Sequence, residues 1–205
     1  MQRAVGAMVV TCCVASVCLA HEAEPDVFSD AAVGFSIEKP KGWHYISADE
    51  TARNRDAVRL KNREVQELIK RRPQPRLVTM ARHHEPHPEL NPSVTVAVKP
   101  ISNPETFDPV DVLQFMVRPL KGVYDDFKIV EAPKKINLKD REAAYAKMHY
   151  TLKSPDDKGF PACTEMWVIP RGENCFIVSA GSSPDPDAPE HAEINKAIES
   201  IEIAP

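Results

Sequence analysis

Residues 143–152 read AAYAKMHYTL, and this stretch decides the fold class. Small or apolar side chains alternate with polar ones along it, which is the two-residue period of a strand with one buried face. Such alternation is typical of an antiparallel sheet that packs its core on one side. The predicted inward-facing residues are the even-numbered ones, Ala144, Ala146, Met148, Tyr150 and Leu152.

Strand patterns also occur on both sides of this stretch. A hairpin is predicted from 162–169 and 174–180, turning at Pro170, Arg171 and Gly172, because proline early and glycine late in a loop favour a turn. The remaining predicted strands are short. They are two strands joined at 40–42, then 77–83, 93–99, 127–131, 136–138 and a terminal strand at 201–203.

Three helices interrupt these strands. Asp49 opens one over about 50–72, where proline and glycine are absent and apolar residues recur at helical spacing. Asp108 followed by Pro109 predicts an N-cap and a first helical residue, and Pro119 bends or ends that helix. The last helix is expected over 189–200. Strands that follow one another through short turns, with three helices between them, predict an α+β layered sandwich in which helices cover an antiparallel sheet.

The composition supports short elements in one domain. The chain has 205 residues with 19 prolines and 7 glycines, and proline fixes φ and removes a backbone donor. This excludes an uninterrupted helical bundle, and the lack of a G-X-Y period excludes collagen. A hydrophobic content of 42% is too high for a disordered chain, so we predict a single domain over residues 21–205.

The first twenty residues, MQRAVGAMVVTCCVASVCLA, predict a signal peptide cleaved after Ala20. We therefore expect a periplasmic or secreted protein that is not an integral membrane protein, because the apolar run is too short for a comfortable span. A lipoprotein modified at Cys18 is the alternative, which the residue before that cysteine disfavours. Loss of Arg3, the only charge in this segment, changes the formal net charge from −4 to −5.

Two cysteines remain after cleavage, Cys163 and Cys175. Export makes a disulfide the first expectation. In the predicted hairpin, however, Cys163 faces the region of Ser179 and Ala180, so Cys175 lies several residues farther along its strand. That separation exceeds the distance a disulfide spans, and we predict two buried free thiols.

A basic segment is the leading candidate for partner binding. Between Arg53 and Arg72 there are eight lysines and arginines against three acids, in a chain that is otherwise acidic. Such a segment binds an acidic protein, an anionic lipid surface or a polyanion, or is simply a solvated helix face. Nucleic acid is not expected as a partner of an exported acidic protein. The candidate partner-binding residues are Arg59, Arg63, Lys70, Arg71 and Arg72.

The loop at 83–92, HHEPHPELNP, is the candidate metal site. His83, His84 and His87 are potential ligands of zinc or copper, with Glu85 and Glu89 beside them. The alternative is a set of solvated loop residues, since the spacing matches no established metal motif. If cleavage follows Ala20, the free amine and imidazole of His21 also form a copper chelate.

Motifs for catalysis are not found. The sequence has no G-x-S-x-G elbow, no phosphate-binding glycine loop and no H-E-x-x-H helix. We therefore expect neither a cofactor nor enzymatic activity, and a metal-dependent chaperone or hydrolase that uses the 83–89 loop remains the competing interpretation.

Four segments resemble the PsbP/Mog-like α/β/α sandwich family, which includes DcrB-like bacterial exported proteins. They are GFSIEKPKGW at 34–43, the 143–152 strand, NCFIVSA at 174–180 and INKAIESIEI at 194–203. The resemblance covers about residues 28–203. It implies a non-enzymatic binding or assembly module, and it carries over no site residue. We expect a monomer whose partner is a protein or another cell-envelope component.

Overall fold

The computed structural model of the chain describes residues 26–56, 58–71 and 75–204. The predicted signal peptide, His21 and Arg72 lie outside these residues. Within the described part of the chain, none of the helices has the length and apolar character that a membrane span requires.

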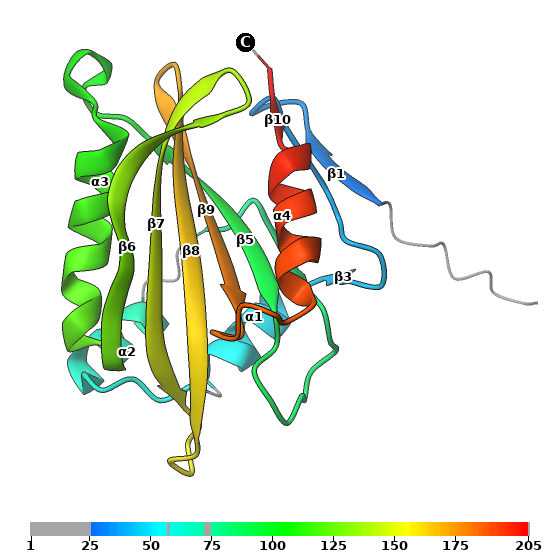
Figure 1. Ribbon diagram of the computed structural model, residues 1–205, viewed down its shortest axis with the longest axis vertical. Helices are drawn as coiled ribbons and strands as arrows, with labels where there is room; N and C mark the ends of the chain where they lie inside the picture. Colours follow the sequence, from blue (N-terminus) through cyan, green and yellow to red (C-terminus); the bar gives the residue numbers. More distant parts are fainter. Residues whose placement is uncertain (1–25, 57, 72–74, 205) are drawn as a thin grey trace, which may run out of the picture.

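Ten strands form two sheets in which every pair is antiparallel, so the predicted α+β class is confirmed (Figure 1). The larger sheet has seven strands in the order β3-β4-β5-β9-β8-β7-β6, and the smaller has the order β1-β2-β10. Their bounds are β1 Val27–Asp30, β2 Phe35–Glu38, β3 His44–Tyr45, β4 Val78–Ala81, β5 Ser93–Pro100, β6 Asp125–Leu138, β7 Arg141–Lys153, β8 Gly159–Arg171, β9 Asn174–Ser182 and β10 Glu202–Ile203.

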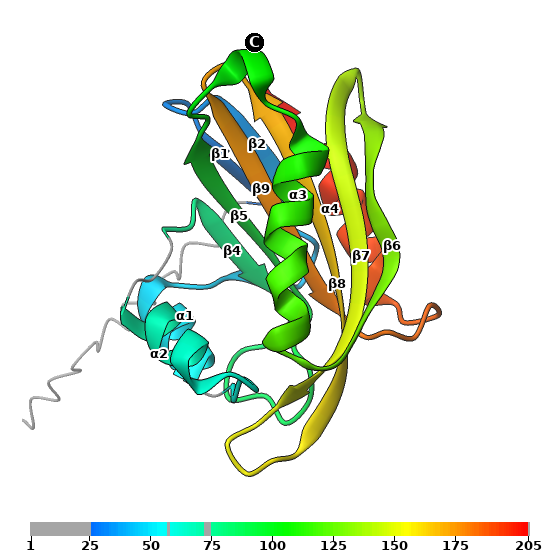
Figure 2. The same cartoon turned by 90° about the vertical axis from the view of Figure 1, so that its left-hand side faces the viewer.

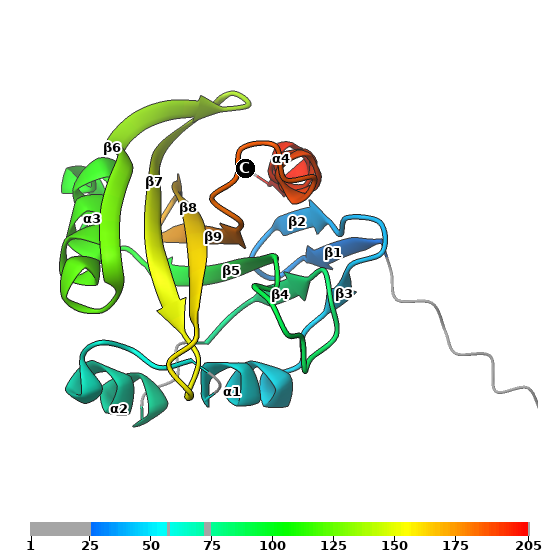
Figure 3. The same cartoon turned by 60° about the horizontal axis from the view of Figure 1, so that its bottom comes forward.

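Helices cover both faces of the large sheet. Figure 2 shows α3 in front of the sheet and α4 behind it, and Figure 3 shows α1 and α2 together at one end of the molecule. The helices are α1 Ala48–Asp56, α2 Arg63–Arg71, α3 Pro109–Val117 and α4 Glu190–Ser200, with 3-10 turns η1 Pro104–Thr106 and η2 Arg118–Gly122.

Two apolar clusters hold these layers together. Under α4 and the small sheet, Phe35, Phe176 and Ile194 belong to one cluster. Under α3, Leu113 and Val117 pack with Met148 and other residues of β7 and β8. Ala144, Ala146 and Met148 are fully buried, as the alternation of β7 predicts, whereas Tyr150 and Leu152 are half-buried toward the end of the strand.

The start of α3 is confirmed in detail. Asp108 is the N-cap, with its side chain accepting a hydrogen bond from the Val110 backbone N–H at 2.7 Å, and Pro109 follows at the first helical position. Proline costs nothing there because that N–H has no partner inside the helix. Pro119 lies in η2, just after the helix ends.

Asp108→Ala is expected to lower the free energy of unfolding by about 1 kcal/mol, because a free backbone donor is left at the start of α3. Asp108→Asn keeps a side-chain acceptor and should stay close to the wild type. Urea denaturation followed by tryptophan fluorescence measures both. Equal midpoints for the alanine variant and the wild type would show that the cap does not stabilise α3.

The predicted helix over 50–72 is wrong in its middle, where α1 and α2 are separate helices. Between them the Arg59 backbone N–H donates to Lys153 at 2.7 Å and makes an isolated bridge to β7. The Gln66 side chain accepts from Leu60 N–H and donates to Val58 C=O, which holds this segment extended. These contacts come from tertiary structure, so the absence of a helix breaker in the sequence did not reveal them.

The 162–180 hairpin is confirmed, but its turn lies later than predicted. Arg171 pairs with Asn174, so the turn residues are Gly172 and Glu173, and Gly172 has a φ of 53° that favours glycine. Pro170 lies within β8, beyond Val168, where pairing with β7 ends and a missing N–H is tolerated.

The same difference in register changes the residue that Cys163 faces in the hairpin. Cys163 pairs with Ser182, and not with the Ser179–Ala180 region. Both cysteines are nonetheless buried and free, so the predicted absence of a disulfide is confirmed.

Strand β6 replaces two predicted short strands. It continues through Pro133 because it is the edge strand of the large sheet, where one side of the backbone needs no partner. Its register against β7 shifts between Asp125 and Lys128, and again on both sides of Glu131. The bulges and the proline make this edge a poor template for pairing with another chain.

Candidate functional site

Of the five predicted partner-binding residues, the structure describes the side chains of Arg59, Arg63 and Arg71. Arg63 and Arg71 are exposed at opposite ends of α2, and the Lys70 side chain and Arg72 lie outside the described residues. Arg59 forms an ion pair with Asp157 at 2.6 Å in the turn between β7 and β8. Separation of α1 from α2 removes Arg59 from the helix, whereas Arg63 and Arg71 share α2.

The structure instead brings Lys61 next to two lysines that are remote in sequence. Lys61, Lys121 and Lys128 line a shallow depression that also contains Tyr124, Asp126 and Phe127. The Lys61 backbone N–H donates to Val123 C=O at 2.9 Å, which attaches the segment before α2 to the end of η2.

Aromatic packing holds Tyr124, one of the residues that line this depression, in place. The Tyr124 ring stacks on Tyr150 of β7 with centroids 4.2 Å apart. Burial raises the pKa of both phenols, so both stay neutral at physiological pH. Asp126 accepts a hydrogen bond from the Thr151 hydroxyl at 2.8 Å. Three lysines and one acid, Asp126, therefore line the depression, and the Asp126 carboxylate is already hydrogen-bonded.

An apolar groove continues from the same place. It is lined by Lys121 and Phe127, shared with the depression, and extends to Ile129 and Pro133 of β6 and to Val117 of α3. Ile129 is 49% exposed. We call the combined area the α2–β6 surface and define it by Lys61, Lys121, Phe127, Lys128 and Ile129.

Sequence reasoning missed Lys121 and Lys128. Neither lies in a basic run, and only the packing of η2 and β6 against the segment before α2 brings them to Lys61.

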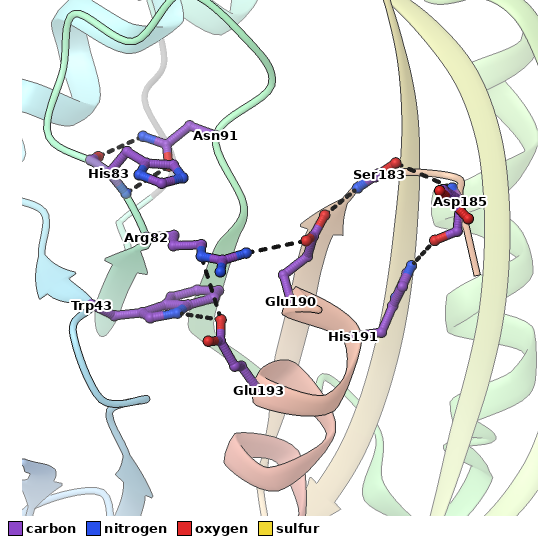
Figure 4. A network of polar contacts seen from close by, with 9 residues as sticks. All are labelled: Trp43, Arg82, His83, Asn91, Ser183, Asp185, Glu190, His191 and Glu193. Carbon is purple, nitrogen blue, oxygen red and sulfur yellow. Dashed lines mark hydrogen bonds and ion pairs between the residues drawn. The ribbon is translucent and has the colours of Figure 1, made fainter. Parts of the chain in front are cut away.

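The predicted metal loop is held by Asn91. Its side-chain oxygen accepts from the His83 backbone N–H at 3.0 Å, and its side-chain nitrogen donates to His83 C=O at 2.6 Å (Figure 4). The same nitrogen donates to the Glu85 carboxylate at 2.8 Å. One asparagine thus holds the backbone of His83 and the side chain of Glu85, the residues on either side of His84.

The three loop histidines point to two different places. The rings of His83 and His87 are stacked, with centroids 4.2 Å apart and planes 5° from parallel. Burial, followed by the proximity of His87, lowers the pKa of His83. The His84 ring instead contacts the ring of His44, with centroids 3.7 Å apart.

His84 therefore joins a group that the sequence did not reveal. One potential ligand atom from each of His44, Glu50 and His84 lies within 4.8 Å of the others, and no second such group occurs among the described residues. His44 is buried on β3, opposite Ala81 of β4. The Ser47-x-x-Glu50 pattern is a capping-box signal that would have placed Glu50 in the first turn of α1. No local pattern indicates that His44 meets His84.

Glu50 is fixed as a carboxylate in this group. The Ser47 backbone N–H donates to it at 2.9 Å, and the Glu50 backbone N–H donates to the Ser47 hydroxyl at 3.2 Å. These hydrogen bonds lower the pKa of Glu50, with a smaller contribution from His44.

A cavity of about 450 Å³ is lined by several neighbours of this group. It lies between α1, the loop after β4 and the turn between β7 and β8, and Thr51, Ala81, Glu85, Leu90 and Phe160 are among its lining residues. Its lining includes Thr51 and Glu85, which follow Glu50 and His84 in sequence, and Ala81, which pairs with His44, but none of the three candidate ligands themselves.

Arg82 ties the base of the loop to α4. Its guanidinium contacts Glu190 at 3.2 Å and Glu193 at 3.6 Å, and the Trp43 indole N–H also donates to Glu193, at 3.0 Å (Figure 4). Glu190 further accepts a hydrogen bond from the Ser183 backbone N–H. This network joins β4 and the loop after it to α4 and the end of β9.

Cys163 lies directly opposite His149 in the β7–β8 pairing. Burial raises the pKa of the Cys163 thiol and lowers the pKa of His149, so both side chains are neutral at pH 7. A thiol nucleophile needs a thiolate, which an electropositive and partly exposed setting would favour. The pair therefore has the electrostatics of packed core residues.

Neither a protein-family model nor a curated protein matches the sequence. Among solved structures, Mycobacterium tuberculosis LpqN, described as involved in cell envelope biogenesis, has a TM-score of 0.51 and 18% identity over 83% of each chain. CyanoP, the PsbP protein of Synechocystis, has a TM-score of 0.50 and 12% identity over 87% of this chain and 91% of its own.

This chain has the PsbP/Mog-like fold. The resemblance recognised in the four sequence segments is thereby confirmed. The Saccharomyces cerevisiae Ran-binding protein Mog1p also matches, with a TM-score of 0.48 and 9% identity over 86% of this chain and 94% of its own. At these identities the likeness establishes the PsbP/Mog-like fold and assigns no function.

Proposed function

We propose that this chain is an exported PsbP/Mog-like binding module of the cell envelope that engages an acidic partner protein through the α2–β6 surface. The observation that carries the proposal is the convergence of Lys61, Lys121 and Lys128 from three separate segments on one depression. Its export rests on the leader at residues 1–20, and the fold shared with LpqN, a protein described as involved in cell envelope biogenesis, supports that setting.

The charge of these lysines is available to a partner. All three are exposed, and none of them forms an ion pair with a described residue. Other cations nearby are neutralised within the chain, such as Lys153 by Asp125 at 3.0 Å. The whole chain carries a formal net charge of −4 and is therefore unfavourable for an acidic partner. The lysines of this surface attract such a partner electrostatically.

Apolar contacts favour a protein as the partner. Phe127 and Ile129 extend the lysine depression into a groove, so that a bound chain would bury apolar area in addition to pairing charges. A surface that recognises only anionic headgroups would need no such groove on β6.

The triple charge reversal Lys61→Glu, Lys121→Glu and Lys128→Glu tests the surface. The matched control reverses three exposed lysines elsewhere, Lys41, Lys139 and Lys196, and changes the net charge equally. Each variant is crosslinked in envelope extracts, and the amount of partner protein recovered with it is measured. We expect this amount to fall about tenfold for the surface variant and to remain at the wild-type level for the control.

Equal recovery with both triple variants would overturn the proposed surface. Sedimentation with protein-free vesicles of anionic phospholipid provides the second arm. Vesicle binding lost only in the surface variant would show that a membrane, and not a protein, is recognised.

Export is tested separately by the mass of the protein isolated from the envelope fraction. We expect a chain beginning at His21. A lipid-modified Cys18 or an uncleaved amino terminus in that fraction would overturn the predicted processing.

A further inference from the structure

Two imidazoles and one carboxylate meet beside β3, although they come from three different elements. His44 belongs to β3, Glu50 to the first turn of α1 and His84 to the loop after β4. Their potential ligand atoms lie within 4.8 Å of one another, and the two imidazole rings are in direct contact.

Each of the three residues is positioned by contacts of its own element. The β3–β4 pairing places His44 opposite Ala81. The reciprocal hydrogen bonds with Ser47 place Glu50. The Asn91 side chain holds His83 on both its backbone N–H and C=O, and therefore positions His84, the next residue. The group is assembled by the fold, as a preorganised site requires.

The donor set matches a borderline transition metal. Neutral imidazole nitrogens and a carboxylate oxygen are the donors that zinc binds, and imidazole also suits copper and nickel. Calcium and magnesium prefer sites made wholly of oxygen ligands, so they fit this group poorly. Three protein ligands leave a coordination position for water or another molecule.

We propose that His44, Glu50 and His84 bind one divalent transition-metal ion. Zinc is the ion used to test this site. Neighbours of the three residues, Thr51, Ala81 and Glu85, line the cavity of about 450 Å³, although the three residues themselves do not. This proposal is independent of the α2–β6 surface, because the two areas share none of their defining residues.

The proposal differs from a site made by the loop alone. His83 and His87 stack on each other away from His84, so the three loop histidines do not converge on one ion. Variants of His84 and of His87 therefore discriminate between the two arrangements, since both belong to the same loop but only His84 belongs to the proposed group.

Calorimetric titration of the untagged mature protein with zinc chloride tests the site. We expect one zinc ion per chain, and we expect His84→Ala and Glu50→Gln each to weaken binding at least about tenfold. His87→Ala should bind as the wild type does. Replacement of His21 by alanine should also leave the stoichiometry at one, which separates this site from an amino-terminal chelate.

Two further readouts guard against a folding artefact. Zinc should raise the urea midpoint of the wild type and of His87→Ala, but not that of His84→Ala, because a ligand that binds only the folded state stabilises it. Cobalt should give the visible absorption of a tetrahedral site in the same two proteins. The proposal fails if His87→Ala loses binding while His84→Ala keeps it, or if the wild type does not bind zinc below about 10 µM.

Discussion

Phe176→Ala is expected to lower the free energy of unfolding by about 3–5 kcal/mol, which is a large part of the stability of an ordinary domain. Phe176 is 1% exposed on β9, and its ring lies 4.9 Å from the ring of Phe35 on β2. The pair joins the three-stranded sheet to the seven-stranded sheet. Truncation therefore leaves a cavity between the sheets in addition to removing apolar contacts.

Urea denaturation monitored by the fluorescence of the two tryptophans measures this loss. Phe115→Ala is the matched control, because Phe115 is 80% exposed on α3 and its removal should change the free energy of unfolding by less than about 0.5 kcal/mol. If the two variants were destabilised equally, Phe176 would not hold the sheets together as described.

Arg82→Met is expected to cost about 2–3 kcal/mol. Breaking a buried ion pair costs more than the pair contributes, because the remaining charge stays buried without its partner. The Glu190 side chain is only 9% exposed and contacts Arg82 at 3.2 Å, while Arg82 is 27% exposed and also contacts Glu193. The partial exposure of Arg82 keeps the expected cost below that of a fully buried pair.

The matched control for Arg82 is Lys135→Met. Lys135 pairs with Glu142 at 3.1 Å, but both side chains are more than half exposed, so its replacement should leave the urea midpoint close to that of the wild type. Arg82→Lys should retain part of the stability, since it keeps a charge beside Glu190 but loses the planar fork that reaches two carboxylates. Equal midpoints for Arg82→Met and Lys135→Met would contradict the role of the network.

Local patterns in the sequence were sufficient for elements whose neighbours along the chain settle their structure. The alternation at 143–152 predicted β7 and its buried alanines, and the Asp108–Pro109 pair predicted the cap of α3. The last helix was also predicted, and Ile194, Ala197, Ile198 and Ile201, which recur at helical spacing, are all buried. In each case, residues close together in the sequence are sufficient to predict the local structure.

Predictions failed where contacts distant in sequence outweighed these patterns. The segment 50–72 has no helix breaker, yet the bridge from Arg59 to Lys153 divides it into two helices. Pro133 predicts the end of a strand, but β6 continues through it because an edge strand of the sheet tolerates proline. The turn after β8 lies later than predicted because the pairing of β8 with β9 along their length determines the register.

The sequence by itself determined the α+β class and the PsbP/Mog-like pattern, because these depend on the periodicity and spacing of apolar residues. Only the tertiary structure decided the candidate sites. His44 meets His84 through the pairing of β3 with β4, and Lys61 meets Lys121 and Lys128 through the contact of its segment with η2. Such meetings depend on strand register and loop path, which side chains far apart in sequence determine together when they pack.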